Sequence, residues 1–316
     1  MIFKIKGKNI AGWFSILIAV AFLLTGSSAF GKAAPAAQKT FSSPEEAVKA
    51  LITAARNNDD KEVMAIFGPA GKDLISSGDP VSDKQRREQF LKAYDEKNSL
   101  VPEKGSMVLV IGKNDWPFPI PLVKKGETWL FDANKGKDEI LNRRIGQNEL
   151  STIQTMLAIV DAQREYAMKD LDGDGILEYA EKFRSDAGKK NGLYWETKDG
   201  EEPSPLGDLV AQARAEGYKQ GGPKNNPVPY HGYYFRMLNK QGKHATGGAF
   251  DYVVKGNQIG GFAIIAYPAT YGNSGVMTFV VNHDGVVYQK DLGKDSAMIA
   301  KAVKAFDTDS TWKKVE

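Results

Sequence analysis

The chain of 316 residues contains no cysteine. This absence excludes disulfide bonds, thiol catalysis and the attachment of a lipid to an N-terminal cysteine. Stability must therefore come from the hydrophobic core and from bound ligands. Long apolar runs are also missing after the N-terminus, because no later run approaches the roughly 20 residues that a membrane-spanning helix requires. We therefore expect no stable membrane span once the N-terminus is removed.

Catalytic motifs are scarce as well. The chain has three histidines, and none has a second histidine at metal-binding spacing. A GxSxG serine motif and a phosphate-binding GxxxxGK[ST] loop are absent. His231, Arg236 and Asp251 are the remaining catalytic candidates, with the histidine as general base and the arginine as a carboxylate ligand. The favoured alternative is a buried Arg–Asp pair that fixes strand register, so a hydrolase-type enzyme is only a second hypothesis.

The N-terminus has the pattern of a secretory signal peptide. Lys4, Lys6 and Lys8 precede an apolar segment at 11–24, and small residues follow. Cleavage is predicted after Ala29 or Gly31, which assigns residues 1–31 to the signal. The alternative, an uncleaved anchor, is disfavoured because the apolar segment is short. We expect the protein in the bacterial periplasm or outside the cell.

The charge balance argues against a nucleic-acid partner. The chain has 42 basic and 39 acidic residues, and removing the three signal lysines leaves 39 of each. A near-neutral protein has no electrostatic attraction to phosphate backbones. We expect an envelope protein or a small ligand as the partner.

Residues 170–181, DLDGDGILEYAE, follow the EF-hand calcium pattern. Acidic residues occupy loop positions one, three, five, nine and twelve, and Gly175 permits the sharp turn at position six. The alternative is a solvated Asp/Gly turn. Since no second loop is present, a weak structural site for Ca²⁺ is predicted rather than a sensor. The predicted ligands are Asp170, Asp172, Asp174, the Ile176 carbonyl, Glu178 and Glu181.

The patterns predict an α+β fold. A linker at 32–42 leads into a small N-terminal domain at 43–148. Ser43, Pro44 and Glu46 are typical of a capped helix start. Further helices are expected at 61–67 and from about Ser82, and strands at 107–111 and 128–131. Helices followed by a hairpin are compatible with a cone-like fold of the nuclear-transport-factor type, and such folds often enclose a pocket.

The segment 116–121, WPFPIP, has a proline at every second position. Proline cannot donate a ladder hydrogen bond, so the segment must be an edge strand or an extended loop. Rigid surface packing is the favoured interpretation. The alternative is an exposed aromatic lip that binds a ligand.

The second domain is expected at 149–316. It begins with a long helix at 151–169, which leads into the acidic loop and a short exiting helix near Tyr179. A helix is predicted at 206–216 and a final helix at 296–306. A hairpin turn is predicted at 282–285. Antiparallel strands are predicted at 233–238, 250–254, 261–267, 277–281 and 286–289.

Several segments resemble a known family. NDWPFPIPLV, RRIGQNEL, GLYW, YHGYYFR and GGAFDY are similar to an uncharacterised family of bacterial exported proteins, a domain of unknown function. The resemblance runs from about Ser43 to the C-terminus and implies export but no activity. The second half also resembles the globular part of type II pseudopilins, which implies a long helix before a small antiparallel sheet.

A pseudopilin also needs an acidic residue in its N-terminal apolar helix, and this chain has none there. A function as a secretion or assembly component is therefore only an alternative hypothesis. The main prediction is a non-enzymatic exported binding protein that calcium stabilises.

Overall fold

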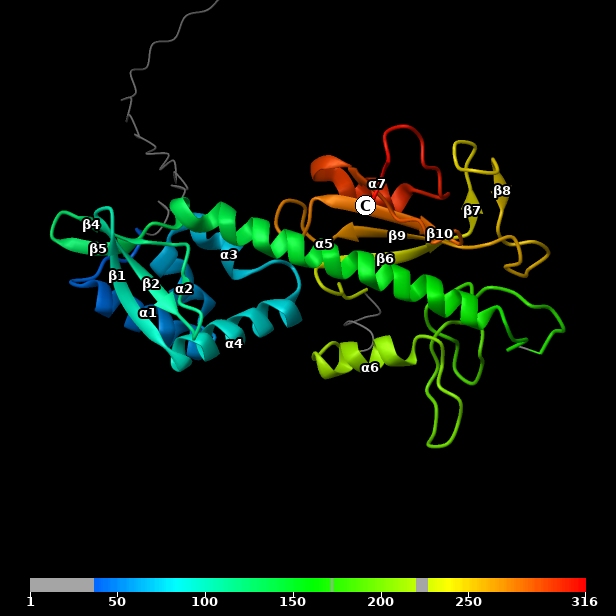
Figure 1. Cartoon of the computed structure of the whole chain (residues 1–316), viewed down its shortest axis with the longest axis horizontal. Helices are drawn as coiled ribbons and strands as arrows, with labels where there is room; N and C mark the ends of the chain where they lie inside the picture. Colours follow the sequence, from blue (N-terminus) through cyan, green and yellow to red (C-terminus); the bar gives the residue numbers. More distant parts are fainter. Residues whose placement is uncertain (1–36, 172, 220–226) are drawn as a thin grey trace, which may run out of the picture. The chain divides into compact units, whose positions relative to one another are not determined.

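The structure is a computed structural model that describes residues 37–171, 173–219 and 227–316 (Figure 1). The predicted signal at 1–31 and the first half of the predicted linker lie outside the described residues. The chain from Ala36 to Glu316 forms one compact unit. The predicted domain boundary at 148/149 falls inside a continuous helix.

The first helices begin at the caps that the sequence predicts. Ser43 caps α1 (Pro44–Arg56), and its Oγ accepts a hydrogen bond from the Glu46 backbone N–H at 3.1 Å. The Glu46 carboxylate reaches back one residue further than a capping box requires, to the N–H of Ser42. The remaining elements of this region are α2 (Asp60–Phe67), η1 (Pro69–Gly71), α3 (Lys72–Ile75) and α4 (Pro80–Glu96).

An antiparallel sheet follows α4. Its strands are β1 (Asn98–Glu103), β2 (Ser106–Ile111), β3 (Trp116–Pro117), β4 (Leu122–Lys125) and β5 (Thr128–Phe131). The order is β1-β2-β4-β5, and β3 pairs with the end of β2. One face packs against α1 and α2 through buried side chains such as Leu109, Phe131 and Ile66. The mostly exposed β1 was not predicted, because NSLVPE has little apolar alternation.

The prolines explain the break along the edge of β2. The β2 strand pairs with β3 near Ile111 and with β4 near Met107. The Phe118 N–H still donates to the Leu109 carbonyl of β2 at 2.7 Å, and residues 119–121 then leave the ladder. Pro119 and Pro121 have no N–H to donate there. The prediction of an edge strand or an extended loop is therefore confirmed.

The helix α5 (Ala133–Tyr166) is far longer than the predicted helix at 151–169. Its first half was missed because Gly136, Gly146 and several polar residues dilute the apolar periodicity of 133–150. The helix packs against both regions of the chain. Its N-terminal half carries Ala133 and Ile140 to the first core, and its C-terminal half carries Met156 and Ile159 to the second.

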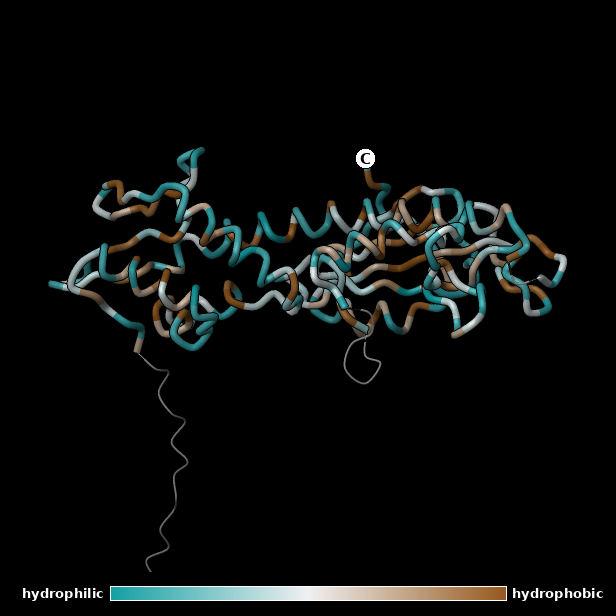
Figure 2. The backbone as a smooth tube through the Cα atoms, turned by 90° about the horizontal axis from the view of Figure 1, so that it is seen from below, coloured by the Kyte–Doolittle hydropathy of each residue, from teal (hydrophilic) through white to brown (hydrophobic). Residues whose placement is uncertain are grey.

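The second sheet is antiparallel with the order β12-β11-β10-β9-β6. Every residue of β9 is buried because both faces are covered. Ile264 packs in the cluster that includes α5, and its neighbour Ile265 packs in the cluster that includes α7 (Ser296–Ala302). Figure 2 shows hydrophobic segments, in brown, along these central strands. The strands are β6 (Tyr233–Leu238), β9 (Ala263–Pro268), β10 (Met277–Asn282), β11 (Tyr288–Asp291) and β12 (Lys313–Lys314).

Three small elements complete the fold. They are α6 (Gly207–Ala215), η3 (Gly293–Asp295) and a two-stranded sheet of β7 (Lys240–Gln241) and β8 (Phe250–Asp251). The α+β class is confirmed, with helices in the N-terminal region and a long helix before the second antiparallel sheet. The prediction of a short helix near Tyr179 is wrong. The Tyr179 backbone N–H donates to the Gln258 carbonyl at 3.0 Å instead of to a helical partner, and residues 176–183 form no helix.

In the part of the chain that the structure describes, no helix combines the length and hydrophobicity needed to cross a bilayer.

Candidate functional site

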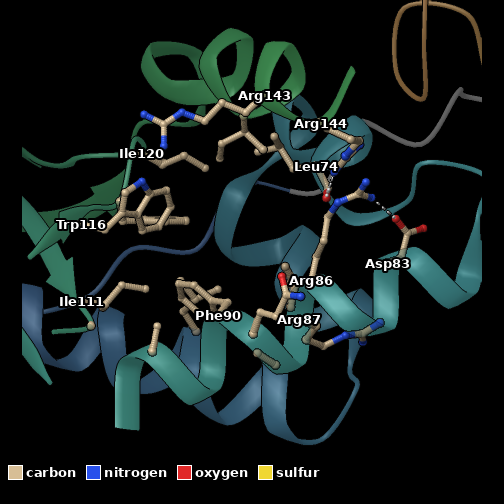
Figure 3. Close-up of a pocket in the computed structure, with 18 of the residues that line it drawn as sticks. Leu74, Asp83, Arg86, Arg87, Phe90, Ile111, Trp116, Ile120, Arg143 and Arg144 are labelled. Atoms are coloured by element: carbon tan, nitrogen blue, oxygen red, sulfur yellow. Dashed lines mark hydrogen bonds and ion pairs between the residues drawn. The ribbon is translucent and has the colours of Figure 1, made fainter. Parts of the chain in front are cut away.

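A pocket of about 780 Å³ lies between α4, the first sheet and the N-terminal half of α5 (Figure 3). Its floor and walls are mainly apolar. Phe90 and Ala93 come from α4, Ile111 comes from the end of β2, and Ile140 comes from α5. Pockets of this size and lining are typical of sites that enclose a small organic molecule.

The proline-rich segment forms one wall of this pocket. Trp116 is half-buried, whereas Phe118 and Ile120 are buried. The rings of Trp116 and Phe118 meet edge to face with centroids 6.1 Å apart. The guanidinium of Arg143 lies 5.7 Å from the Trp116 ring, which places a cation beside the aromatic rim. Phe118 and Ile120 therefore pack as the favoured interpretation predicts, and Trp116 is partly exposed at the pocket, where ligand binding stays a prediction.

Arg86 and Arg144 lie side by side at the end of the pocket away from Trp116 (Figure 3). Arg86 comes from α4 and donates from Nη2 to Asn148 Oδ1 at 2.7 Å. Arg144 comes from α5, is only 6% exposed, and donates to the carbonyls of Asp73 and Leu74 at 2.7 and 2.8 Å. It also donates to Asn273 Oδ1.

These two guanidinium groups are incompletely satisfied. Within the described residues, Nη1 of Arg86 and Nε of Arg144 are buried and have no hydrogen-bond partner. Asp83 Oδ1 lies 3.7 Å from the Arg86 Nη1, which is too far for a hydrogen bond. A buried donor without an acceptor costs about 1–3 kcal/mol. Arg86 and Arg144 each therefore keep one buried nitrogen without an acceptor among the described residues.

The electrostatics agree with this geometry. Burial lowers the pKa of Arg86, although Asp83 acts in the opposite direction. Burial, and then the nearby charge of Arg86, lower the pKa of Arg144 to about 10. Both groups still carry a positive charge at neutral pH. Five basic and three acidic side chains line the pocket, so its electrostatic balance is positive.

A fully buried carboxylate holds the start of α4 in place. Asp79 accepts hydrogen bonds from the backbone N–H groups of Val81 and Ser82, both at 3.1 Å. Its other oxygen accepts from the Tyr218 hydroxyl and the Gly232 N–H, both at 2.8 Å. The cap of α4 therefore bonds to residues about 140 and 150 positions away, and α4 carries Arg86, Phe90 and Ala93 of the pocket lining.

The acidic loop is compact. One Asp170 oxygen accepts from the Gly173 N–H at 2.7 Å and the other accepts from the Gly175 N–H at 2.9 Å. Asp174 accepts from the Ile176 N–H at 2.8 Å and from the Asn257 side chain. These bonds place Asp170 and Asp174, two of the predicted ligands, in one turn. Their carboxylate oxygens are the kind of ligand that calcium prefers.

The second half of the loop departs from an EF-hand. The Glu178 carboxylate accepts from the Gln258 N–H at 2.6 Å, Glu181 is exposed, and Leu177 is 59% exposed instead of packed on a helix. Asp172 lies outside the described residues. Among the residues that are described, no group of three or more His, Asp or Glu side chains is arranged around a common metal position.

The three candidate catalytic residues contact different parts of the fold. His231 Nε2 lies 3.1 Å from the Glu216 carboxylate, and burial lowers the pKa of this histidine. Arg236 donates to the carbonyls of Ala300 and Val303 at the end of α7. Asp251 is exposed and lies 3.9 Å from the Lys240 ammonium.

Sequence reasoning missed the arginines of the pocket. The pairs at 86–87 and 143–144 look like ordinary solvated helix charges. The available signal was that each pair is followed by apolar residues, Phe90 and Leu91 in one case and Ile145 in the other. Only the fold shows that α4 and α5 border one pocket and that both arginines of each pair line it.

Comparison with known proteins gives a family but no activity. The sequence profile of the family described as "Protein of unknown function (DUF2950)" matches residues 38–315. No curated protein and no solved structure matches the chain. The likeness of the second half to pseudopilins therefore stays a prediction. Because the match spans nearly all of the described residues, the chain belongs to the DUF2950 family.

Proposed function

We propose that this protein is an exported, non-enzymatic binding protein whose pocket takes a small apolar ligand. The observation that carries this proposal is the 780 Å³ pocket with its lining of Phe90, Ile111, Trp116 and Ile120. An apolar cavity of this size, with a few polar groups at one end, is typical of small-molecule sites. Burial of a ligand against these side chains supplies the hydrophobic driving force at about 25 cal/mol for each Å² removed from water.

Export is the part of the proposal that depends on the N-terminus. The lysines at positions 4, 6 and 8, the apolar stretch and the small residues after it support secretion to the periplasm or the medium. The absence of cysteine is compatible with that compartment. Together these features favour an envelope protein that binds its ligand outside the cytoplasm.

A neutral fluorescent probe tests the pocket directly. Phenylnaphthylamine should bind the purified protein with a blue shift and increased emission. Replacing Ala93 by Phe should weaken this binding at least about tenfold, or 1.4 kcal/mol, because the ring fills space between Phe90 and the end of β2. Fluorescence titration measures both affinities.

The matched control for this titration is Ala211→Phe on the exposed face of α6, outside the pocket. It should leave the affinity within about twofold, or 0.4 kcal/mol. Equal binding by the Ala93→Phe and wild-type proteins would place the probe elsewhere and remove the support for the pocket.

We further propose that the loop at 170–181 binds calcium and stabilises the region around the second sheet. Support comes from the spacing of its acidic residues and from the compact turn around Asp170 and Asp174. Asp174 and Glu178 also bond to Asn257 and Gln258, so an ion in this loop would act on a second turn of the chain.

Calcium should raise the melting temperature. With a Kd of about 10⁻³ M, calcium at about 10 mM stabilises the folded protein by about 1.4 kcal/mol, which corresponds to a few degrees. Glu181→Gln should remove most of this gain, whereas Glu165→Gln, the same change on exposed α5 surface, should keep it. Differential scanning fluorimetry with calcium and with magnesium measures the shifts. A melting temperature that does not respond to calcium contradicts this site.

The other functions considered have less support. A hydrolase at His231, Arg236 and Asp251 requires these side chains to meet, and each has its contacts elsewhere. We therefore propose no reaction at them. A secretion or pilus-like assembly component depends on the pseudopilin resemblance of the second half, which no solved structure supports.

A further inference from the structure

The end of the pocket occupied by Arg86 and Arg144 has a composition that an apolar ligand alone does not explain. Charged side chains are expensive to bury, and two like charges side by side are more expensive. Arg144 is anchored by carbonyl groups and by Asn273, which accept hydrogen bonds without neutralising its charge. Asp83 and Asp79 partly offset the charge of Arg86, and Asp83 and Asp73 partly offset that of Arg144, but none of these carboxylates makes a hydrogen bond to the Arg86 Nη1 or the Arg144 Nε.

We propose that the ligand is an amphiphile with one anionic head group, a carboxylate or a phosphate, that binds to Arg86 and Arg144. This inference rests on the proposed binding function and adds the chemical class of the ligand. Guanidinium groups bind planar oxyanions through charge-assisted hydrogen bonds, which are stronger than neutral ones. The free Nη1 of Arg86 and Nε of Arg144 are the donors that the head group would engage.

The chemistry of the rest of the ligand is inferred from the apolar walls of the pocket. Phe90, Ile111 and Ile120 line the apolar part of the pocket, and Figure 3 shows Ile111 and Ile120 on the Trp116 side with Phe90 between that side and Arg86. An alkyl chain or a ring system fits these surfaces, because it offers no hydrogen-bonding group that the walls would leave unsatisfied. The rim itself carries Trp116 with Arg143 beside it, so the far end of the ligand meets a polarisable surface.

A chain-matched series tests the head group separately from the chain. Dodecanoate, dodecyl phosphate, dodecanol and dodecyltrimethylammonium are titrated below their aggregation concentrations as competitors of phenylnaphthylamine. The anionic compounds should bind at least about tenfold more tightly than the alcohol, and the ammonium compound should bind most weakly. Comparison of dodecanoate with dodecyl phosphate distinguishes a carboxylate from a phosphate head.

The arginine variants assign the effect to the pocket. Arg86→Gln should weaken dodecanoate binding about tenfold or more and leave dodecanol within about twofold. The control is Arg56→Gln, which removes the same charge from an exposed pair with Asp95 outside the pocket. It should change neither affinity by more than about twofold.

A second variant acts in the opposite direction and keeps the test valid if Arg86→Gln is poorly folded. Asp83→Asn removes the negative charge nearest to Arg86 and should increase the dodecanoate affinity severalfold without changing that of dodecanol.

The outcomes separate the two proposals. Equal affinities for dodecanoate and dodecanol would overturn the anionic head group and leave the apolar pocket in place. If neither compound displaces the probe and the probe itself does not bind, the proposed binding function fails and this inference fails with it. Preferential binding of the anion that Arg86→Gln and Asp83→Asn leave unchanged would place the head group elsewhere and also overturn the inference.

Discussion

Replacing Asp79 by Ala should lower the free energy of unfolding by about 4 kcal/mol. The carboxylate is fully buried and accepts four hydrogen bonds, from Val81, Ser82, Tyr218 and Gly232. Loss of the helix cap alone costs about 1 kcal/mol. The buried hydroxyl and the buried Gly232 N–H then have no acceptor, and each adds about 1–3 kcal/mol. Urea denaturation followed by circular dichroism measures the difference.

The matched control for this variant is Asp95→Ala on the same helix. Asp95 is exposed and pairs with Arg56 on the surface, so its removal should cost less than about 1 kcal/mol. A loss below about 1 kcal/mol for Asp79→Ala as well would mean that the four bonds to its carboxylate contribute little. Asp79 sets the start of α4, so Asp79→Ala should also weaken probe binding in the pocket.

Gly136→Ala should destabilise the protein by about 2–3 kcal/mol, although alanine is the better helix former by about 1 kcal/mol. A Cβ atom at Gly136 would lie 2.2 Å from the Pro119 carbonyl oxygen and 2.7 Å from the Ile120 nitrogen. Both of these are backbone atoms and cannot rotate away. Either α5 or the proline-rich wall must move, so Gly136→Ala should also weaken binding of the neutral probe.

Gly146→Ala in the same helix is the control of opposite sign. Apart from its chain neighbours and the backbone of its own helix, nothing lies within 4 Å of the Cβ position there, so only helix propensity changes and stability should rise by up to about 1 kcal/mol. Thermal and urea denaturation of the two variants compare them directly. If both substitutions stabilise the protein to the same extent, α5 does not pack closely on 119–120 and the pocket wall is placed wrongly.

Local patterns predicted the elements that local forces determine. Ser43 and Pro44 start α1 as expected because capping involves neighbours in sequence. The central strands β9 and β10 were found because an apolar run bounded by turn residues is a strong signal even when both faces are buried. The prolines of 116–121 predicted an edge strand or an extended loop, because the missing N–H groups are a local property of the sequence.

The pocket and its charged end depend on long-range packing, and the sequence gives little indication of them. Arg86 and Arg144 are 58 positions apart and meet only because α4 and α5 face one cavity. The acceptor role of Asp79 likewise depends on Tyr218 and Gly232, which lie far along the chain. Charged residues on helices are usually solvated, so nothing in a helical pattern marks the few that turn inward.

Binding of an anionic amphiphile in the pocket of the N-terminal region is tested most directly with a dodecanoate analogue that carries a diazirine in its chain. The analogue is photo-crosslinked to the purified protein and the labelled peptides are mapped. We expect label on α4 around Phe90 and Ala93 and on residues 111–120, with loss of that label in the Ala93→Phe protein and in the presence of excess dodecanoate. Label confined to other segments, or label on α4 that excess dodecanoate does not reduce, would contradict the account.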